Sequence, residues 1–209
     1  MATPLPEQRI TPEELLPDNQ SLPSYATTSA TRVLQKQLKE IIKLQISTNL
    51  GNQRYWTLDL SRLDDLYTWY FTLSSFDPEI PLSKDLRKFN LEAVHLQVKF
   101  GPQHPTTPPF VRIIKPRFMQ WMHGGGGHVT AGGSICIDML TMKGWKKNIT
   151  VDTVLMVVHQ ALSDLDPVPA RLVGAHEYGI QEAVNAYIRV ANTHGWRVPQ
   201  HWNSLFVRN

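Results

Sequence analysis

The chain has 209 residues, of which 42% are hydrophobic and 19% are charged, and its formal net charge is +3. A chain of this length usually forms one domain whose core needs neither metal nor disulfide, and so small a charge gives no reason to expect a nucleic-acid-binding protein. The single cysteine excludes an intramolecular disulfide and a thiolate cage for a metal ion.

The first 25 residues have few large apolar side chains. They hold five prolines: Pro4, Pro6, Pro12, Pro17 and Pro23. This composition is typical of a linker or a loosely attached arm. The N-terminus lacks the basic segment followed by an apolar segment that marks a secretory signal. No apolar run of the sequence approaches the roughly 20 residues of a membrane span. We therefore expect a soluble protein of the cytoplasm or nucleus that binds no membrane, with an arm over residues 1–25 and one domain over residues 26–209.

The pattern becomes helical from Thr28 to Ser47. Apolar residues recur there at spacings of three and four, as in an amphipathic helix: Leu34, Leu38, Ile41, Ile42 and Ile46. Ser29 or Thr31 is expected to cap the helix, and Gly51 to stop it. The opposite face is basic, with Arg32, Lys36, Lys39 and Lys43. That face is either a solvated surface or a docking surface for an acidic partner.

Four segments rich in aromatic and β-branched residues follow, and each predicts a strand: 53–60, 67–76, 91–100 and 110–115. Pro, Asp, Ser and Lys separate the second segment from the third. The double proline Pro108–Pro109 precedes the fourth and cannot lie inside a paired strand. Successive strands with short connections favour an antiparallel meander.

Two more helices are predicted near the end of the chain. The first covers "ITVDTVLMVVHQALSDL", with Thr150 as its cap and Pro167 just beyond its end. Its stripe consists of Val151, Val154, Leu155, Val158 and Leu162. The second runs from about Tyr178 to Thr193 and stops at Gly195; its inner face holds Ile180, Val184, Tyr187, Ile188 and Ala191. Helices segregated from an antiparallel sheet make an α+β fold.

Residues 116–149 show no long periodic element, and connections of this length are usually functional or disordered. They contain "HGGGGHVTAGGSICIDML", where a glycine-lined surface can accept an extended peptide or aim N–H groups at an anion. Cys136 lies here, and from residue type alone a small buried hydrophobe is the commonest interpretation. The glycines lack the Lys of a phosphate loop, and a metal site at His123 and His128 lacks further ligands. A cysteine protease needs a positioned histidine, whereas a thiol carrier needs an accessible cysteine and an oxyanion donor.

The order of motifs resembles the ubiquitin-conjugating enzymes over residues 28–196. The resemblance rests on the first helix, Trp69 in "YTWYFTL", the double proline of "HPTTPPFVRI", "GGSICIDMLT", Trp145 and the "DPVP" at 166–169. In this pattern Cys136 falls at the thioester position. "GGSICIDMLTMKGW", "PARLVGAHEYG" and "ANTHGWRVP" are similar to the Q-type branch of the family. The resemblance implies the ubiquitin-conjugating fold with a longer C-terminal helical end.

Two departures from the family pattern concern the site. The Asn of the usual His-Pro-Asn, eight residues before the cysteine, is replaced by His128. The acidic residue that most members carry shortly after "DPxP" is replaced by about Arg171. The Q-type branch also lacks the asparagine, so the loss of this residue does not imply inactivity. It leaves open which group donates a hydrogen bond to the oxyanion.

The resemblance implies that Cys136 takes ubiquitin as a thioester from an activating enzyme and yields it to a lysine, or to a serine or threonine. It suggests His128 as an oxyanion donor or base, and Asp138 as a group that orients or deprotonates the acceptor. Trp145, His194 and Trp196 are further candidates on the acceptor side. The expected partners are ubiquitin, the activating enzyme at the basic helix face, a ubiquitin ligase and a protein substrate, with no cofactor. A catalytically silent ubiquitin-binding module of the same fold is the alternative.

Overall fold

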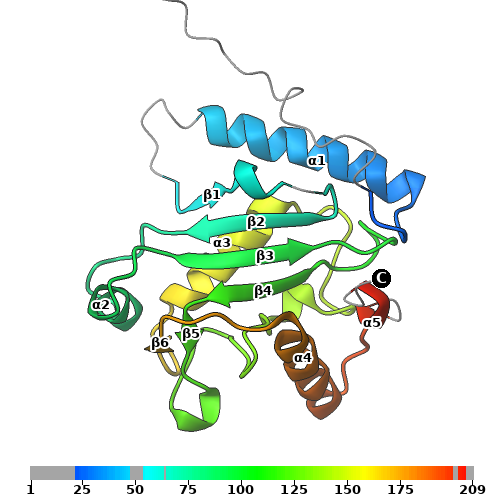
Figure 1. Cartoon of the computed structure of the whole chain (residues 1–209). Helices are drawn as coiled ribbons and strands as arrows, with labels where there is room; N and C mark the ends of the chain where they lie inside the picture. The colour runs from blue at the N-terminus through cyan, green and yellow to red at the C-terminus, as the bar shows by residue number, and fades with distance from the viewer. Residues whose placement is uncertain (1–21, 48–53, 64, 200–201, 206–209) are drawn as a thin grey trace, which may run out of the picture.

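The computed structural model describes residues 22–47, 54–63, 65–199 and 202–205. Four strands form one antiparallel sheet in the order β1 (Trp56–Leu58), β2 (Thr68–Leu73), β3 (Val94–Lys99) and β4 (Phe110–Lys115). The helix α1 (Thr28–Ser47) lies along the β1 edge, and α3 (Val151–Ser163) lies behind the sheet (Figure 1). The expected meander and the α+β class are thus confirmed; the first three strands are shorter than the segments that predicted them, and β4 has the predicted bounds.

The α1 helix packs against the sheet through the stripe that the sequence predicts. Leu34, Leu38, Ile41 and Ile42 are buried, but Ile46 is 45% exposed, so its placement on the inner face was wrong. Gln45 takes the inward position in that turn: its Oε1 accepts from the Leu58 N–H at 2.6 Å and its Nε2 donates to the Leu58 carbonyl at 3.2 Å. These bonds satisfy backbone groups of an edge strand that would otherwise lack partners.

The start of α1 differs from the expectation. Thr27 caps it, because its Oγ1 accepts from the Ala30 N–H at 3.3 Å, and neither Ser29 nor Thr31 does so. Gly51, the expected stop, lies outside the described residues, as does the predicted arm up to residue 21. Leu22 and Tyr25 pack against the core.

A helix that the sequence analysis did not predict, α2 (Pro81–Lys88), lies between β2 and β3. Its proline stands in the first turn, where the missing N–H costs no hydrogen bond. Leu82 and Leu86 are buried one turn apart, and Asp85 is only 5% exposed. Two apolar positions in eight residues are too few for a periodic signal, so the segment was interpreted as a connection.

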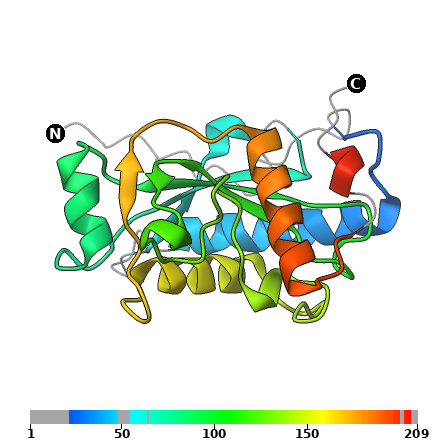
Figure 2. The same cartoon turned by 90° about the horizontal axis from the view of Figure 1, so that it is seen from below.

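The helix α3 has the Thr150 cap and the five-residue stripe that the sequence predicts. The short strands β5 (Arg117–Phe118) and β6 (Leu172–Gly174) pair with each other, and neither was predicted. The helix α4 (Ile180–His194) lies beside the β4 edge and runs across the direction of α1 and α3 (Figure 2). With α5 (Trp202–Leu205) it builds a second cluster around Phe110, Tyr187 and Trp202.

Neither a membrane span nor a metal centre is found in the described part of the chain. None of their helices combines the length and the apolar character that crossing a bilayer requires. Nor do three or more His, Cys, Asp or Glu side chains in this part of the chain gather into a group that could hold a metal ion.

Candidate active site around Cys136

Residues 128–136 form a tight turn that lies along the free edge of β4. The Ile113 N–H donates to the Gly133 carbonyl at 2.7 Å, and the Ile135 N–H donates to the Val111 carbonyl at 2.9 Å. Within the turn, the Cys136 N–H donates to the His128 carbonyl at 2.8 Å. These bonds fix the backbone of Cys136 against the sheet, although the segment contains no regular element.

The glycines before the turn serve close packing more than an open wall. Gly125 and Gly126 are buried, and a Cβ on either would overlap the carbonyl oxygen of Met119 or Val168. The Gly126 N–H donates to the Pro169 carbonyl at 3.0 Å. The glycine run therefore lets this backbone approach the "DPVP" segment, a role that only residues without a side chain can fill.

Cys136 is half-buried. Burial raises the pKa of its thiol to about 11. At neutral pH only about one thiol in ten thousand is then ionised, far less than the few per cent expected of a free cysteine. The resting thiol is therefore a weakly reactive group.

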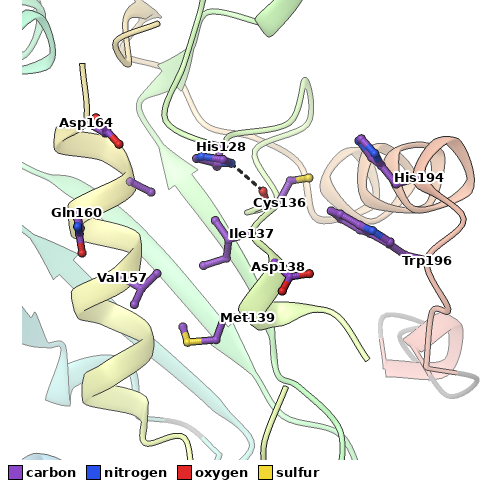
Figure 3. Close-up of a pocket in the computed structure, with 11 residues that line it drawn as sticks. His128, Cys136, Ile137, Asp138, Met139, Val157, Gln160, Asp164, His194 and Trp196 are labelled. Atoms are coloured by element: carbon purple, nitrogen blue, oxygen red, sulfur yellow. Dashed lines mark hydrogen bonds between the residues drawn. The ribbon is translucent and has the colours of Figure 1, made fainter. Parts of the chain in front are cut away.

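His128 holds the backbone of Cys136 and not its sulfur. His128 adopts a positive φ of 56°, and its Nδ1 lies 3.1 Å from the Cys136 carbonyl oxygen. A carbonyl only accepts, so Nδ1 carries the proton and the neutral ring has an unprotonated Nε2. The sulfur points away from this ring, toward the end of α4 (Figure 3). A protease-like pair of thiol and imidazole is thus not formed here.

A pocket of about 580 Å³ lies beside Cys136. We call it the acidic pocket, because Asp138 and Asp164 both line it, together with Gln160 of α3. Asp138 follows the cysteine by two residues, whereas Asp164 lies just past the end of α3. Figure 3 shows Gln160 and Asp164 on one side of Cys136, and His194 and Trp196 on the other.

A second cavity, of about 470 Å³, meets the first at Cys136. We call it the apolar groove. Its wall includes Trp121, Gly125, Gly126, Val129 and Val190, and no described carboxylate lines it. His128 and His194 line both cavities. The thiol therefore lines two cavities, and only the acidic pocket is lined by described carboxylates.

The end of α4 brings His194 and Trp196 to the site. Gly195 has a left-handed φ of 67°, and the Trp196 N–H returns to the Ala191 carbonyl at 2.8 Å. This is the glycine-dependent Schellman arrangement, and it reverses the chain within one residue. The His194 and Trp196 rings consequently stack, with centroids 4.8 Å apart and an interplanar angle of 21°.

The remaining predicted residues lie elsewhere. Trp145 is buried, its Nε1 donates to the Pro105 carbonyl at 2.8 Å, and it lines neither cavity. Arg171 forms two hydrogen bonds with Asp85, at 2.7 and 3.0 Å. Although burial raises the pKa of Asp85, its bonds from Arg171 and the Leu172 N–H hold that pKa below its ordinary value. The Arg171 charge is thus compensated and does not face the thiol.

The basic face lies on α1, at the opposite edge of the sheet from α4 (Figure 1). Arg32, Lys36 and Lys43 are exposed, and Lys39 is half-buried. This surface is separate from both cavities, so a partner docked on it leaves the thiol accessible.

The sequence analysis missed Asp164 and Trp121. Val157, Gln160 and Asp164 follow at spacings of three and four, so a helical wheel places them on one face of α3. The helical wheel does not show that this face lies near Cys136, because the position of the face depends on how α3 packs against the sheet. Trp121 stands in a glycine-rich segment without periodicity, where no local pattern predicts the direction of a side chain.

The comparisons with known proteins agree with this fold. The family model described as "Ubiquitin-conjugating enzyme" matches residues 83–187. The chain belongs to the ubiquitin-conjugating enzyme family. Residues 83–187 include the thiol and both acidic residues, whereas His194 and Trp196 lie beyond the matched range.

Two relatives and one solved structure describe the extent of the similarity. The Q-type ubiquitin-conjugating enzyme-like protein CG4502 of Drosophila melanogaster is 29% identical over 82% of this chain and 54% of its own length. The ubiquitin-conjugating enzyme E2 Q1 of Homo sapiens is 30% identical over 83% of this chain and 40% of its own length. The chain thus spans about half or less of these two relatives. The crystal structure of the ubiquitin-conjugating enzyme E2 UbcA1 from Agrocybe aegerita has a TM-score of 0.50 and 22% identity, over 68% of this chain and 88% of its own, and it supports the fold alone.

Proposed function

We propose that this chain is a ubiquitin-conjugating enzyme that carries ubiquitin as a thioester on Cys136. The observation that supports this most is the position of the thiol: it is the only cysteine, and it lies where two cavities meet in a fold of this family. A carrier needs that arrangement because one reactant must enter while the other leaves.

Charging is a thioester exchange. The Cys136 sulfur attacks the carbonyl carbon of ubiquitin's last residue, a new C–S bond forms, and the bond to the activating enzyme's sulfur breaks. That sulfur leaves as a thiolate and takes up the proton that Cys136 loses. A strong base is unnecessary, because thiolates are good nucleophiles and good leaving groups. The raised pKa of Cys136 makes its ionised form rare but more nucleophilic.

Discharge passes the acyl group to a nucleophile and returns the thiol. We propose that the acidic pocket receives an amine, because Asp138 and Asp164 attract a lysine ammonium and can accept its proton. Arg171 stands where most members of the family carry an acidic residue. The Asp164 carboxylate then supplies the negative charge that this position lacks here. Serine or threonine hydroxyls are the second class of acceptor. His128 and His194 line the acidic pocket, and either imidazole can act as a base toward such a hydroxyl. Trp196 stacks on His194 and holds its ring.

His128 acts in this scheme chiefly as a positioning residue. Its Nδ1–H bond to the Cys136 carbonyl fixes the backbone that carries the thiol. Its Nε2 donates to an oxyanion only when the ring is protonated. The partners that the family implies are ubiquitin, an activating enzyme docked on the basic face of α1, a ligase and a protein substrate.

The test is adduct formation with ubiquitin, activating enzyme and ATP, followed on a gel without reductant. The wild type forms an adduct that reductant removes. Cys136→Ser forms one more slowly, and it resists reductant, because an alkoxide leaves less readily than a thiolate. Cys136→Ala forms none, and an unchanged melting temperature shows that the variant is folded. A silent ubiquitin-binding module predicts no adduct even for the wild type.

A further inference from the structure

The chain turns back to the sheet after it has passed the thiol. Its described residues 196–199 and 202–205, which we call the strap, lead from the end of α4 to the short helix α5. Figure 1 shows α5 at the end of the sheet where β4 begins. The strap lies beyond residues 83–187, which the family model matches, so membership of the family does not account for it.

Trp202 fastens the far end of the strap. Its side chain is only 1% exposed. The centroid of its ring lies 5.1 Å from that of Phe110 and 4.8 Å from that of Tyr187. The Trp202 backbone N–H donates to the Pro199 carbonyl at 3.0 Å, which closes a turn within the strap. Because aromatic side chains bury the largest apolar areas, the contact of Trp202 with these two rings is the main anchor of the strap.

The near end of the strap lies at the thiol. Trp196 packs against the same hydrophobic cluster as Trp202, and it lines the acidic pocket together with Cys136. Its ring stacks on His194, which lines both cavities. The Cys136 sulfur points toward these two rings (Figure 3). The position of the Trp196 ring at the thiol therefore depends on two attachments, the end of α4 and the seat of Trp202.

The anchor of the strap lacks side-chain hydrogen bonds. The Trp202 indole N–H and the hydroxyl of Tyr25, which packs on the same cluster, are buried without a hydrogen-bond partner among the described residues. The buried indoles of Trp56, Trp69 and Trp145 each donate a hydrogen bond. A contact with unpaired donors opens at a lower cost than one with paired donors, because the donors gain water on release. Ring packing thus holds the strap in a seat from which it can be released.

We propose that the strap covers the Cys136 thiol, and that Trp202 is the positioning residue that keeps it closed. Tyr187, in the seat of Trp202, lies within electrostatic reach of the thiol: burial chiefly, and Cys136 in addition, raise the pKa of Tyr187. Opening the strap withdraws Trp196 from the pocket wall and lets water reach the sulfur. The thiol then ionises more readily, because water stabilises its charged form. Release of the strap thus converts a shielded thiol into a reactive one.

The test is the rate at which iodoacetamide alkylates Cys136 in the full chain, measured at pH 8 without ubiquitin. Trp202→Ala is expected to raise that rate about tenfold, because a pKa one unit closer to its ordinary value multiplies the thiolate tenfold. Trp202→Phe keeps a ring in the seat and removes only the unpaired donor, so it is expected to react like the wild type. Trp56→Ala is the matched control, since it removes an equally buried tryptophan from β1, at the other edge of the sheet.

Melting temperatures show whether each variant is folded, and all rates are measured well below them. If Trp202→Ala does not fold, Trp202→Leu takes its place. Leucine keeps much of the apolar volume but not the ring contacts, so this variant is expected to raise the alkylation rate to a smaller extent.

Faster alkylation of Trp202→Ala, with wild-type rates for Trp202→Phe and Trp56→Ala, supports the proposal. Equal rates for Trp202→Ala and the wild type overturn it, because something other than the strap then shields the thiol. The same rise in Trp202→Phe or in Trp56→Ala overturns it too, since the effect then does not come from the ring in this seat. The measurement uses no ubiquitin, so this proposal and the proposed function can fail separately.

Discussion

The acidic pocket and the apolar groove share Cys136, His128 and His194, yet they differ in origin and in charge. The acidic pocket is built on regular elements, with Asp164 just past the end of α3 and Asp138 opening a 3₁₀ turn. The apolar groove is built mainly from the irregular segment before the cysteine, which is held by backbone bonds to residues 169–171. The difference teaches that regular elements bring the carboxylates to the thiol, whereas the irregular segment contributes mainly apolar side chains and backbone.

The largest effect expected concerns the sulfur between the two cavities. If the pKa of Cys136 is about 11, its alkylation by iodoacetamide should rise about 100-fold between pH 7 and 9, because each pH unit below the pKa multiplies the thiolate tenfold. The rate should not level off before pH 10. The denatured chain is the control, and its single thiol should titrate near the ordinary value of about 8.5. A plateau near pH 8.5 in the folded protein would show that the thiol is not shielded.

The second effect tests the charge of the acidic pocket. Asp138→Asn with Asp164→Asn should slow discharge onto free lysine about tenfold, because two carboxylates no longer attract and deprotonate the amine. Single-turnover discharge of the charged protein measures it. The matched control is Asp166→Asn, which is exposed but lines neither cavity. Equal rates for the double variant and the control would remove the acids from the acceptor side.

A third variant changes a surface remote from both cavities. Lys36→Glu with Lys43→Glu on α1 should slow charging about fivefold, because the activating enzyme is attracted less, and should leave discharge onto lysine unchanged. Lys84→Glu with Lys88→Glu on α2 makes the same charge change on another exposed helix. The charging rates of the two double variants are compared in reactions stopped at successive times. The idea of a docking face fails if both pairs slow charging alike.

The smallest effect concerns the histidines common to both cavities. We expect the wild type to discharge onto free threonine at a rate comparable with lysine, and His128→Ala or His194→Ala to lower the threonine rate about threefold by removing a base. His123→Ala, exposed and outside both cavities, is the control. Strong preference for lysine, with neutral effects of His128→Ala and His194→Ala, would exclude hydroxyl acceptors.

Periodic segments were predicted well from the sequence. The buried positions of α3 follow a stripe with a period near 3.6, and Thr150 supplies an oxygen to its first turn. The meander order follows from strand composition and short connections. Such features depend on interactions between residues that are close in the sequence, so the sequence alone predicts them.

The site was predicted only in part, because its parts meet through tertiary packing. Cys136 and His194 were identified from motifs, but their shared cavity depends on how α4 lies beside β4. Arg171 was expected in the place of the usual acidic residue near the acceptor, yet it pairs with Asp85 from a helix that the local sequence pattern did not predict. The glycines were expected to line a surface for an extended peptide or an anion, whereas Gly126 packs against Val168, 42 residues later in the chain.

The most direct measurement separates the two half-reactions in one set of proteins. Charging from the activating enzyme and discharge onto lysine are each timed for the wild type, for Asp138→Asn with Asp164→Asn, and for Asp166→Asn. The account predicts that the acidic pair slows discharge and leaves charging unchanged, and that Asp166→Asn changes neither step. If the acidic pair slows both steps equally, the two carboxylates do not act on the acceptor, and the account is contradicted.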